Sequence, residues 1–315
     1  MLLQLLRRTL VFTLTLVLAS IAVFAFMVVL PGDPARVALG IQATEEALAA
    51  TRAEFGLDRP LVVQYLDWVG GLLRGDFGVS YVTRARIGPL VSDRLQVTAW
   101  LVGAGMLVAL VVALPLGILS AMRHRQVSGM ALSGAAQVGM AVPNFLAGIL
   151  LVTVVSVQLG WLPSGGWVAP VEDPAEFLRR LVLPALALGL VQGAVVTRYV
   201  RSAVLDVMRE DYLRTARAKG LGPYRALVRH GLRNAAIPVV TVLALQLATL
   251  LIGAVVVERV FVIPGLGSLL LDGVANRDLL LVQNVVMVLV VAVLLVNYLV
   301  DVLYTILDPR LRRVA

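Results

Sequence analysis

The residue types that most often perform chemistry are scarce in this sequence. Its 315 residues include two histidines, His124 and His230, and no cysteine, which excludes disulfides and thiolate metal sites. Neither His-Glu-x-x-His nor Gly-x-Ser-x-Gly occurs, although these patterns are common in metal-dependent and serine-dependent hydrolases. The phosphate-binding pattern Gly-x4-Gly-Lys-Ser/Thr is missing as well. We therefore expect no catalytic residue, no metal ligand and no nucleotide cofactor on this chain.

The composition predicts an all-α membrane protein. Hydrophobic residues make up 60% of the chain and charged residues 15%, against about 45–50% and about 25% in an average soluble domain. The apolar residues form long uncharged runs separated by short charged ones, as in proteins that cross a bilayer several times. The net charge of +8 comes from basic residues that flank these runs. Membrane orientation therefore explains the charge better than nucleic acid binding, and we expect no nucleic acid partner.

Six transmembrane helices are predicted, because a helix needs about 20 apolar residues to cross a bilayer. They occupy residues 9–30, 95–122, 130–158, 181–197, 235–257 and 279–300. We expect a kink at Pro143-Asn144 in the third and a turn over residues 160–166. The first run could instead be a signal peptide, but it exceeds the roughly 7–15 apolar residues of that class, so we expect it to be retained.

The distribution of basic residues predicts which side of the membrane each loop occupies. Residues 198–233 carry nine Lys/Arg and three acids, whereas residues 31–94 carry seven Arg and eight acids. Positively charged loops stay in the cytoplasm, so we expect the loop between the fourth and fifth helices and both termini to be cytoplasmic. The expected organisation is an N-terminal segment with the first helix (1–30), an extracytoplasmic region (31–94) and a core membrane domain (95–315) with the other five helices. Two short helices are expected in the extracytoplasmic region, one capped by Thr44 and one over residues 65–73.

The cytoplasmic 206–236 segment carries the most specific pattern. Good helix formers lead to Gly220, which is suited to end a helix, and Pro223 is suited to begin the next. We expect two short, basic, amphipathic helices joined by a tight turn. Such a turn could fit a cleft in another protein, or the segment could lie on anionic lipid as an interfacial helix. These two interpretations are left open by the physical pattern.

The same segment resembles the EAA loop of ABC importer permeases, whose coupling helices dock into ATPase subunits. Arg214-Thr215-Ala216 stands where the general pattern has Glu-Ala-Ala, and this departure is typical of the DppB/OppB-type dipeptide and oligopeptide permeases. Other stretches in the order of that family are Pro31-Gly32-Asp33-Pro34-Ala35, Gly56-Leu57-Asp58-Arg59-Pro60, Leu73-Arg74-Gly75-Asp76-Phe77-Gly78, Val257-Glu258-Arg259-Val260-Phe261, Pro264-Gly265-Leu266-Gly267, Asn297, Asp301 and Asp308-Pro309-Arg310.

The resemblance implies a type I ABC importer permease fold in a bacterial inner (plasma) membrane. Such a chain would form half of a translocation pathway with a second homologous permease subunit, as a heterodimer. Two ATPase subunits would hold ATP and Mg²⁺, and an extracytoplasmic solute-binding protein would deliver the cargo. The residues implied to couple to the ATPases are Asp211, Tyr212, Arg214, Thr215, Ala216, Arg217, Lys219, Gly220 and Leu221.

The resemblance specifies the fold more closely than it specifies the cargo. Dipeptides and oligopeptides are the main expectation, and glutathione, nickel chelates, haem or oligosaccharides are alternatives within the same fold. An ion-coupled carrier is a further alternative, but such carriers bury acids at mid-membrane and the predicted spans are nearly free of them.

A second candidate site lies at the extracytoplasmic end of the fifth helix. It could form an external gate or a contact with the binding protein, and a local ion pair of its two charged residues is an equally open interpretation. The residues are Glu258, Arg259, Phe261, Pro264 and Gly265. Polar residues within the predicted spans could line the pathway, although hydrogen bonding between helices is their commoner use; they are Thr98, Gln137, Asn144, Gln158, Gln192, Thr241, Gln246 and Asn284.

Overall fold

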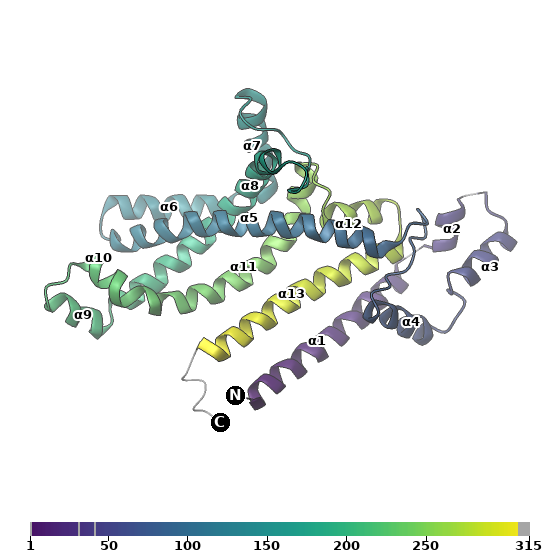
Figure 1. Ribbon diagram of the computed structural model, residues 1–315, viewed down its shortest axis with the longest axis horizontal. Coiled ribbons are helices and arrows are strands. Elements are labelled where there is room, and N and C mark those ends of the chain that lie inside the picture. The colour runs from purple at the N-terminus through teal and green to yellow at the C-terminus, as the bar shows by residue number, and fades with distance from the viewer. Residues whose placement is uncertain (1, 31, 41, 308–315) are drawn as a thin grey trace. The chain divides into compact units, whose positions relative to one another are not determined.

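The computed structural model describes residues 2–30, 32–40 and 42–307, and helices account for nearly all of them (Figure 1). The only strand-like pairing in these residues is an isolated bridge between Val79 and Arg86. Asp308-Pro309-Arg310, expected to end the last helix, lies outside the described residues, as does the side chain of Asp301. In chain order the helices are α1 (Leu2–Val29), α2 (Pro34–Leu39), α3 (Glu45–Glu54), α4 (Leu61–Leu73), α5 (Ile87–Met122), α6 (Val127–Ala141), α7 (Asn144–Leu151), η1 (Val152–Gln158), α8 (Pro174–Met208), α9 (Asp211–Ala218), α10 (Pro223–Ala226), η2 (Leu227–Gly231), α11 (Leu232–Val260), α12 (Leu266–Ala275) and α13 (Leu279–Leu307).

The predicted all-α membrane fold is confirmed. Five helical stretches are long and apolar enough to cross a bilayer, and a sixth span is formed if the bent pair Val127–Ala141 and Asn144–Gln158 counts as one. The kink expected at Pro143-Asn144 is confirmed, and it is large, because the two halves bend by 98°. Pro143 cannot donate a backbone hydrogen bond and disfavours a helical conformation in the residue before it, and Val142 is accordingly extended.

Several helices begin earlier than the apolar runs predict. The second predicted span began at residue 95, but α5 begins at Ile87 because Ile87 and Val91 are buried in a cluster with Leu266 and Val285. Likewise α8 begins at Pro174 rather than near residue 181, and α4 begins at Leu61 rather than Tyr65. Hydropathy marks where a helix enters lipid, whereas packing and caps decide where it starts.

The chain forms two compact units, of which the first comprises Met1–Val97 and Pro264–Ala315. Within it α1 packs along α13, as Figure 1 shows in purple and yellow, and α12 packs against α13. The 31–94 region is attached to the start of α13 by Asn284, which accepts from Trp68 Nε1 at 3.1 Å and donates to the Phe77 carbonyl at 2.9 Å. Ser80 also donates to Asp278. The expected cap at Thr44 is confirmed by its hydrogen bond from the Ala47 amide.

The second unit, Thr98–Ile263, is built around α8, which packs against α6, α7 and α11. Glycines allow α5 and α8 to approach closely. A Cβ atom at Gly117 would lie 2.6 Å from the Val200 Cβ, and one at Gly189 would lie 2.6 Å from the Gly105 carbonyl oxygen. Small residues are favoured at such crossings because lipid offers no hydrophobic driving force and association depends on contact.

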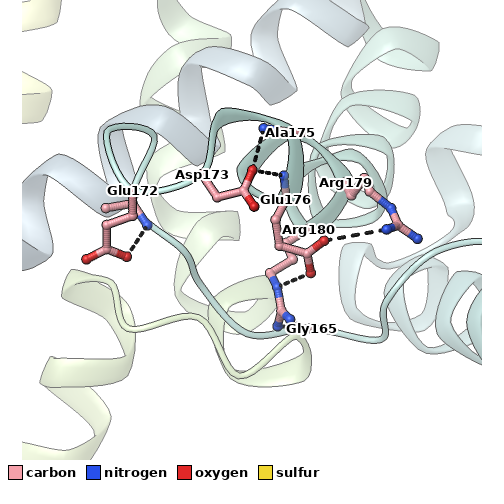
Figure 2. Close-up of polar contacts among 8 residues, drawn as sticks. Gly165, Glu172, Asp173, Ala175, Glu176, Arg179 and Arg180 are labelled. Carbon is pink, nitrogen blue, oxygen red and sulfur yellow. Dashed lines mark hydrogen bonds and ion pairs between the residues drawn. The ribbon is translucent and has the colours of Figure 1, made fainter.

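Polar contacts fix the N-terminal end of α8 (Figure 2). Asp173 caps the helix by accepting from the Ala175 and Glu176 amides, each at 3.0 Å. Arg180 donates to Glu176 at 2.7 Å and to the Gly165 carbonyl at 2.9 Å. The loop that precedes α8 is therefore held against the helix it enters, and residues 160–166 form the turn that the sequence predicts, with positive φ at Gly160 and Gly166.

We expect Gly117→Ala to destabilise the protein, because a methyl group there meets both a side chain and the Thr197 carbonyl. Overpacking costs about 1–3 kcal/mol, which exceeds the roughly 1 kcal/mol that Ala gains over Gly as a helix former. Gly103→Ala on the same helix is the matched control, because nothing lies within 4 Å of its Cβ position. Thermal unfolding in detergent measures both variants, and equal midpoints would contradict the close approach of α5 and α8.

Candidate functional site

The 206–236 segment contains a tight turn that ends α9. Gly220 has φ +91°, its amide donates to the Arg217 carbonyl at 3.0 Å, and the Leu221 amide donates to the Ala216 carbonyl at 3.3 Å. This pair of bonds is the Schellman arrangement, which requires a left-handed residue where Gly220 stands. The prediction that Gly220 ends a helix is confirmed. A Cβ atom on Gly220 would meet nothing within 4 Å, so within this chain only the backbone conformation favours glycine at this position.

The apolar side of α9 is buried within the chain. Leu213 is 0% exposed and Ala216 9%, in one cluster with residues of α8 and α11 such as Val207 and Ala235. Leu221, just after the turn, packs against the same cluster. A helix that inserts into a membrane surface needs a free apolar face. The side chains that would provide this face on α9, Leu213 and Ala216, are already covered by protein, so insertion of α9 into the membrane surface is disfavoured.

The opposite side of the segment is exposed and basic. Arg214, Arg217, Lys219 and Arg225 are all exposed, together with Tyr224. An ion pair between Arg214 and Asp211 at 3.3 Å joins two side chains that are both mostly in solvent, so it contributes little stability. This basic turn (residues 214–225) is a surface with fixed backbone geometry, because the buried cluster and the turn hydrogen bonds hold it from beneath.

The second half of the segment differs from the prediction of a separate short helix. α10 has four residues and continues through the π-helical turn Leu227–Gly231 directly into α11, so Pro223–Val260 is one helical stretch of 38 residues. Gly231 allows close packing, since a Cβ atom there would lie 2.8 Å from Leu227 Cδ1 and 3.2 Å from Leu213 Cδ1. The Asn234 amide also donates to the Tyr212 hydroxyl at 2.8 Å. The turn is thus joined to a long helix without an intervening loop.

The nine predicted coupling residues fall on two sides of this structure. Ala216 and Leu221 face the apolar cluster, whereas the other seven are exposed. Gly231, Asn234 and Leu213 support the site but were not among the predicted residues. The one sequence signal for this support is the i, i+3 spacing of Leu213 and Ala216, which is typical of the buried face of a helix.

The second candidate site, at the end of α11, is mostly enclosed. Glu258 and Phe261 are 0% exposed, and Thr98 donates to the Glu258 carboxyl at 2.6 Å. The Gly166 amide donates to the Phe261 carbonyl at 2.8 Å. Arg259 is exposed, Pro264 is half-buried and Gly265 is buried. In this conformation Arg259 is the side chain of this set best placed to meet another protein.

Several of the polar residues in the spans bond within the protein. Gln192 donates to Gln246 between α8 and α11, Thr98 bonds Glu258, and Asn284 holds the 31–94 region. These contacts agree with the commoner use of polar groups in membrane helices, which is to join neighbouring elements.

We expect Gly220→Val to loosen the turn and Gly220→Asn to preserve it. A left-handed conformation costs most L-residues about 1–2 kcal/mol, a β-branched residue is the least tolerant, and asparagine adopts it readily. Hydrogen exchange of the Leu221 amide should therefore be roughly tenfold faster in Gly220→Val, with little change in Gly220→Asn. Equal protection in the two variants would show that φ at this position does not govern the turn.

Comparisons with known proteins identify the family and the fold. Residues 113–313 match the family described as binding-protein-dependent transport system inner membrane component, and residues 1–102 match its N-terminal component. The chain is 40% identical over 308 residues to the glutathione transport system permease protein GsiC of Salmonella typhimurium, covering 98% of each chain. It is also 40% identical over 299 residues to GsiC of Escherichia coli strain K12, covering 95% of each.

Two solved structures share the fold. The methionine ABC transporter MetNI, in an inward-facing form, matches with a TM-score of 0.55 at 18% identity, covering 70% of this chain and 96% of that one. An amino acid ABC transporter solved with histidines matches with a TM-score of 0.52 at 16% identity, covering 70% and 94%. At these identities the likeness concerns the fold alone. The family matches and the GsiC relatives show that this chain belongs to the binding-protein-dependent transport system inner membrane components, the permease subunits of ABC importers.

Proposed function

We propose that this chain forms half of a translocation pathway for glutathione or similarly short peptides, and that the basic turn at residues 214–225 docks into a partner ATPase subunit. The observation that carries the proposal is the rigid exposed turn, whose apolar side is already buried within the chain. A surface of this kind has a fixed shape that can fit a protein cleft, but α9 exposes little apolar area that could insert into lipid. ATP and Mg²⁺ would be held by the ATPase chains.

The helical continuity from Pro223 to Val260 supports a mechanical role for the turn. A force applied at residues 214–225 would act on α10 and pass through Leu227–Gly231 into α11. No flexible loop separates these helices, so the displacement would reach α11 directly. The cluster around Leu213 would also transmit the force to α8, whose C-terminal end packs there. Rigid-body motion of packed helices is the usual way in which such a push alternates access.

The glutathione assignment is supported by the curated relatives, which are glutathione permeases at 40% identity over almost the full chain. This similarity favours glutathione over dipeptides and longer oligopeptides as the main substrate. We further propose a second permease subunit and a solute-binding protein as partners. The 206–236 segment and both termini would face the cytoplasm, as the basic residues predict.

The docking surface can be tested with Gly222→Glu. Gly222 has an ordinary φ of −63° and open space around its Cβ position, so the new side chain adds bulk and charge without backbone strain. We expect ATPase assembly and uptake to fall at least tenfold while the protein remains folded, because a buried unpaired charge at an interface costs about 2–5 kcal/mol. Ser128→Glu, at another exposed position, is the matched control and should retain both.

Lys219 offers a direct probe of the same surface, because it is the only lysine in the chain. A lysine-specific protease therefore has one cleavage site, inside the basic turn. We expect cleavage of the isolated permease and protection in the assembled transporter, with equal cleavage after denaturation. Undiminished cleavage in an assembled, ATP-hydrolysing complex would refute docking at this turn.

The cargo is tested by transport into vesicles that contain the complete transporter and its binding protein. We expect labelled glutathione to accumulate in an ATP-dependent manner, and an excess of unlabelled glutathione to compete at least tenfold better than dipeptides, pentapeptides or a nickel chelate. Preferred uptake of any of these competitors would replace glutathione as the proposed cargo. Uptake by the chain without ATPase subunits would instead favour an ion-coupled carrier.

A further inference from the structure

A cleft of about 600 Å³ lies within the first unit, and its lining includes no residue of the basic turn or of α11. Its walls come from the C-terminal end of α1, the 31–94 region and the first turns of α13. The volume is within the range of sites that bind small organic ligands, roughly 300–1,000 Å³. The transport role proposed above does not use this cleft.

One buried amide in the wall of the cleft lacks a partner. Gln283 is 7% exposed and lines the cleft, and its Nε2 is buried without a hydrogen bond. An unsatisfied buried donor costs free energy, and such groups in native proteins call for an explanation such as a bound molecule. Nearby Asn284, one residue further along α13, has its amide fully bonded to the Phe77 and Leu280 carbonyls. Gln283 Nε2 is thus an unsatisfied donor on a side chain that lines the cleft.

The charges of the cleft suit a ligand that carries both signs. Arg52 donates to Asp33 at 2.5 Å and Arg59 to Asp67 at 2.5 Å, and Asp76 also lines the wall. The Arg52 hydrogen bonds keep the pKa of the Asp33 carboxyl below its usual value, so this pair is charged at neutral pH. With two cations beside three anions, the cleft offers no net attraction to an anionic group but can pair with a zwitterion.

An apolar cavity adjoins this polar cleft. A second space of about 220 Å³ shares Leu30, Gly32, Asp33, Pro34 and Leu279 with the first. Apart from Asp33 and Arg277, its walls are apolar and include Val37, Val274 and Val282. A polar chamber beside an apolar one matches an amphiphile, with a headgroup in the first and part of a hydrocarbon chain in the second.

The surroundings of the cleft are suited to lipid. Gln64, Tyr65 and Trp68 of α4 face inward, whereas Val62, Leu66 and Leu73 expose 69%, 60% and 84% of their surface at i, i+4 and i+11. An apolar stripe of this kind on a short helix is typical of a helix lying at the bilayer interface. The aromatic side chains of α4 also pack on Phe24 of α1, so the cleft lies between a membrane-spanning helix and an interfacial one.

We propose that this cleft binds a zwitterionic phospholipid from the leaflet that borders the 31–94 region. The phosphate or a carbonyl oxygen of the lipid accepts from Gln283 Nε2, and the headgroup ammonium meets the carboxylate side of the cleft. One acyl chain follows the apolar cavity beside Val282. The bound lipid links α1, α13 and the 31–94 region, which places it where it can steady the first unit of the permease.

The test is native mass spectrometry of the assembled transporter, purified with a limiting amount of phosphatidylethanolamine or phosphatidylglycerol. We expect one retained phosphatidylethanolamine per copy of this chain, held more tightly than phosphatidylglycerol. Gln283→Leu should weaken retention roughly fivefold, the change expected for the loss of one neutral hydrogen bond.

Arg59→Met provides a second variant in case Gln283→Leu does not fold, since Arg59 lines the cleft and is half-exposed. It should also weaken lipid retention. Arg36→Met is its matched control, because Arg36 forms a similarly exposed ion pair with Glu45 but does not line the cleft. Equal retention in all variants, no retained lipid, or displacement of the lipid by glutathione would each overturn the proposal. None of these outcomes depends on whether the transporter docks its ATPase at the basic turn.

Discussion

The close approach of α5 and α8 is the contact on which the second unit depends. Inside a bilayer the hydrocarbon of the lipid competes equally with apolar side chains, so helices remain together only where their surfaces fit closely. Gly105 and Gly117 on α5 face residues of α8, and Gly189 and Gly193 on α8 face residues of α5. At each of these glycines even a methyl group would meet neighbouring atoms at 3.3 Å or less. Because α6, α7 and α11 pack on α8 in turn, the position of α8 determines where the ends of these helices lie.

The basic turn is a consequence of this packing. The ends of α8 and α11 supply a cluster of buried side chains, and α9 is held against it by Leu213 and Ala216. Burial of these side chains leaves arginines and the single lysine on the outer surface. The turn is therefore rigid although it is exposed, which is what a docking surface requires if the binding energy is not to be spent on ordering a loop.

The first unit follows a different principle, in which hydrogen bonds attach irregular chain to helices. Asn284 and Asp278, near the start of α13, hold residues 68–80. The Asp33–Arg52 pair holds α2 to α3. These attachments leave a cleft with apolar and charged walls, and Gln283 Nε2 is the buried donor within it that they do not satisfy. The first unit thus holds the 31–94 region against α1 and α13, and it contains a cleft with the polar and apolar walls that an amphiphile would need.

The sequence by itself determined the membrane class, the approximate positions of the spans, the capped helix after Thr44 and the end of α9 at Gly220, because hydropathy, caps and left-handed turns are local properties. It also carried the motifs by which the family resemblance was found. Only the tertiary structure decided the 98° break in the third span, the early start of α5 at Ile87 and the continuity of α10 with α11. It alone showed that Leu213 is buried, that Glu258 is enclosed and that Gln283 lacks a partner. These properties depend on contacts between residues far apart in the chain, and local sequence patterns do not predict which distant residues will be in contact.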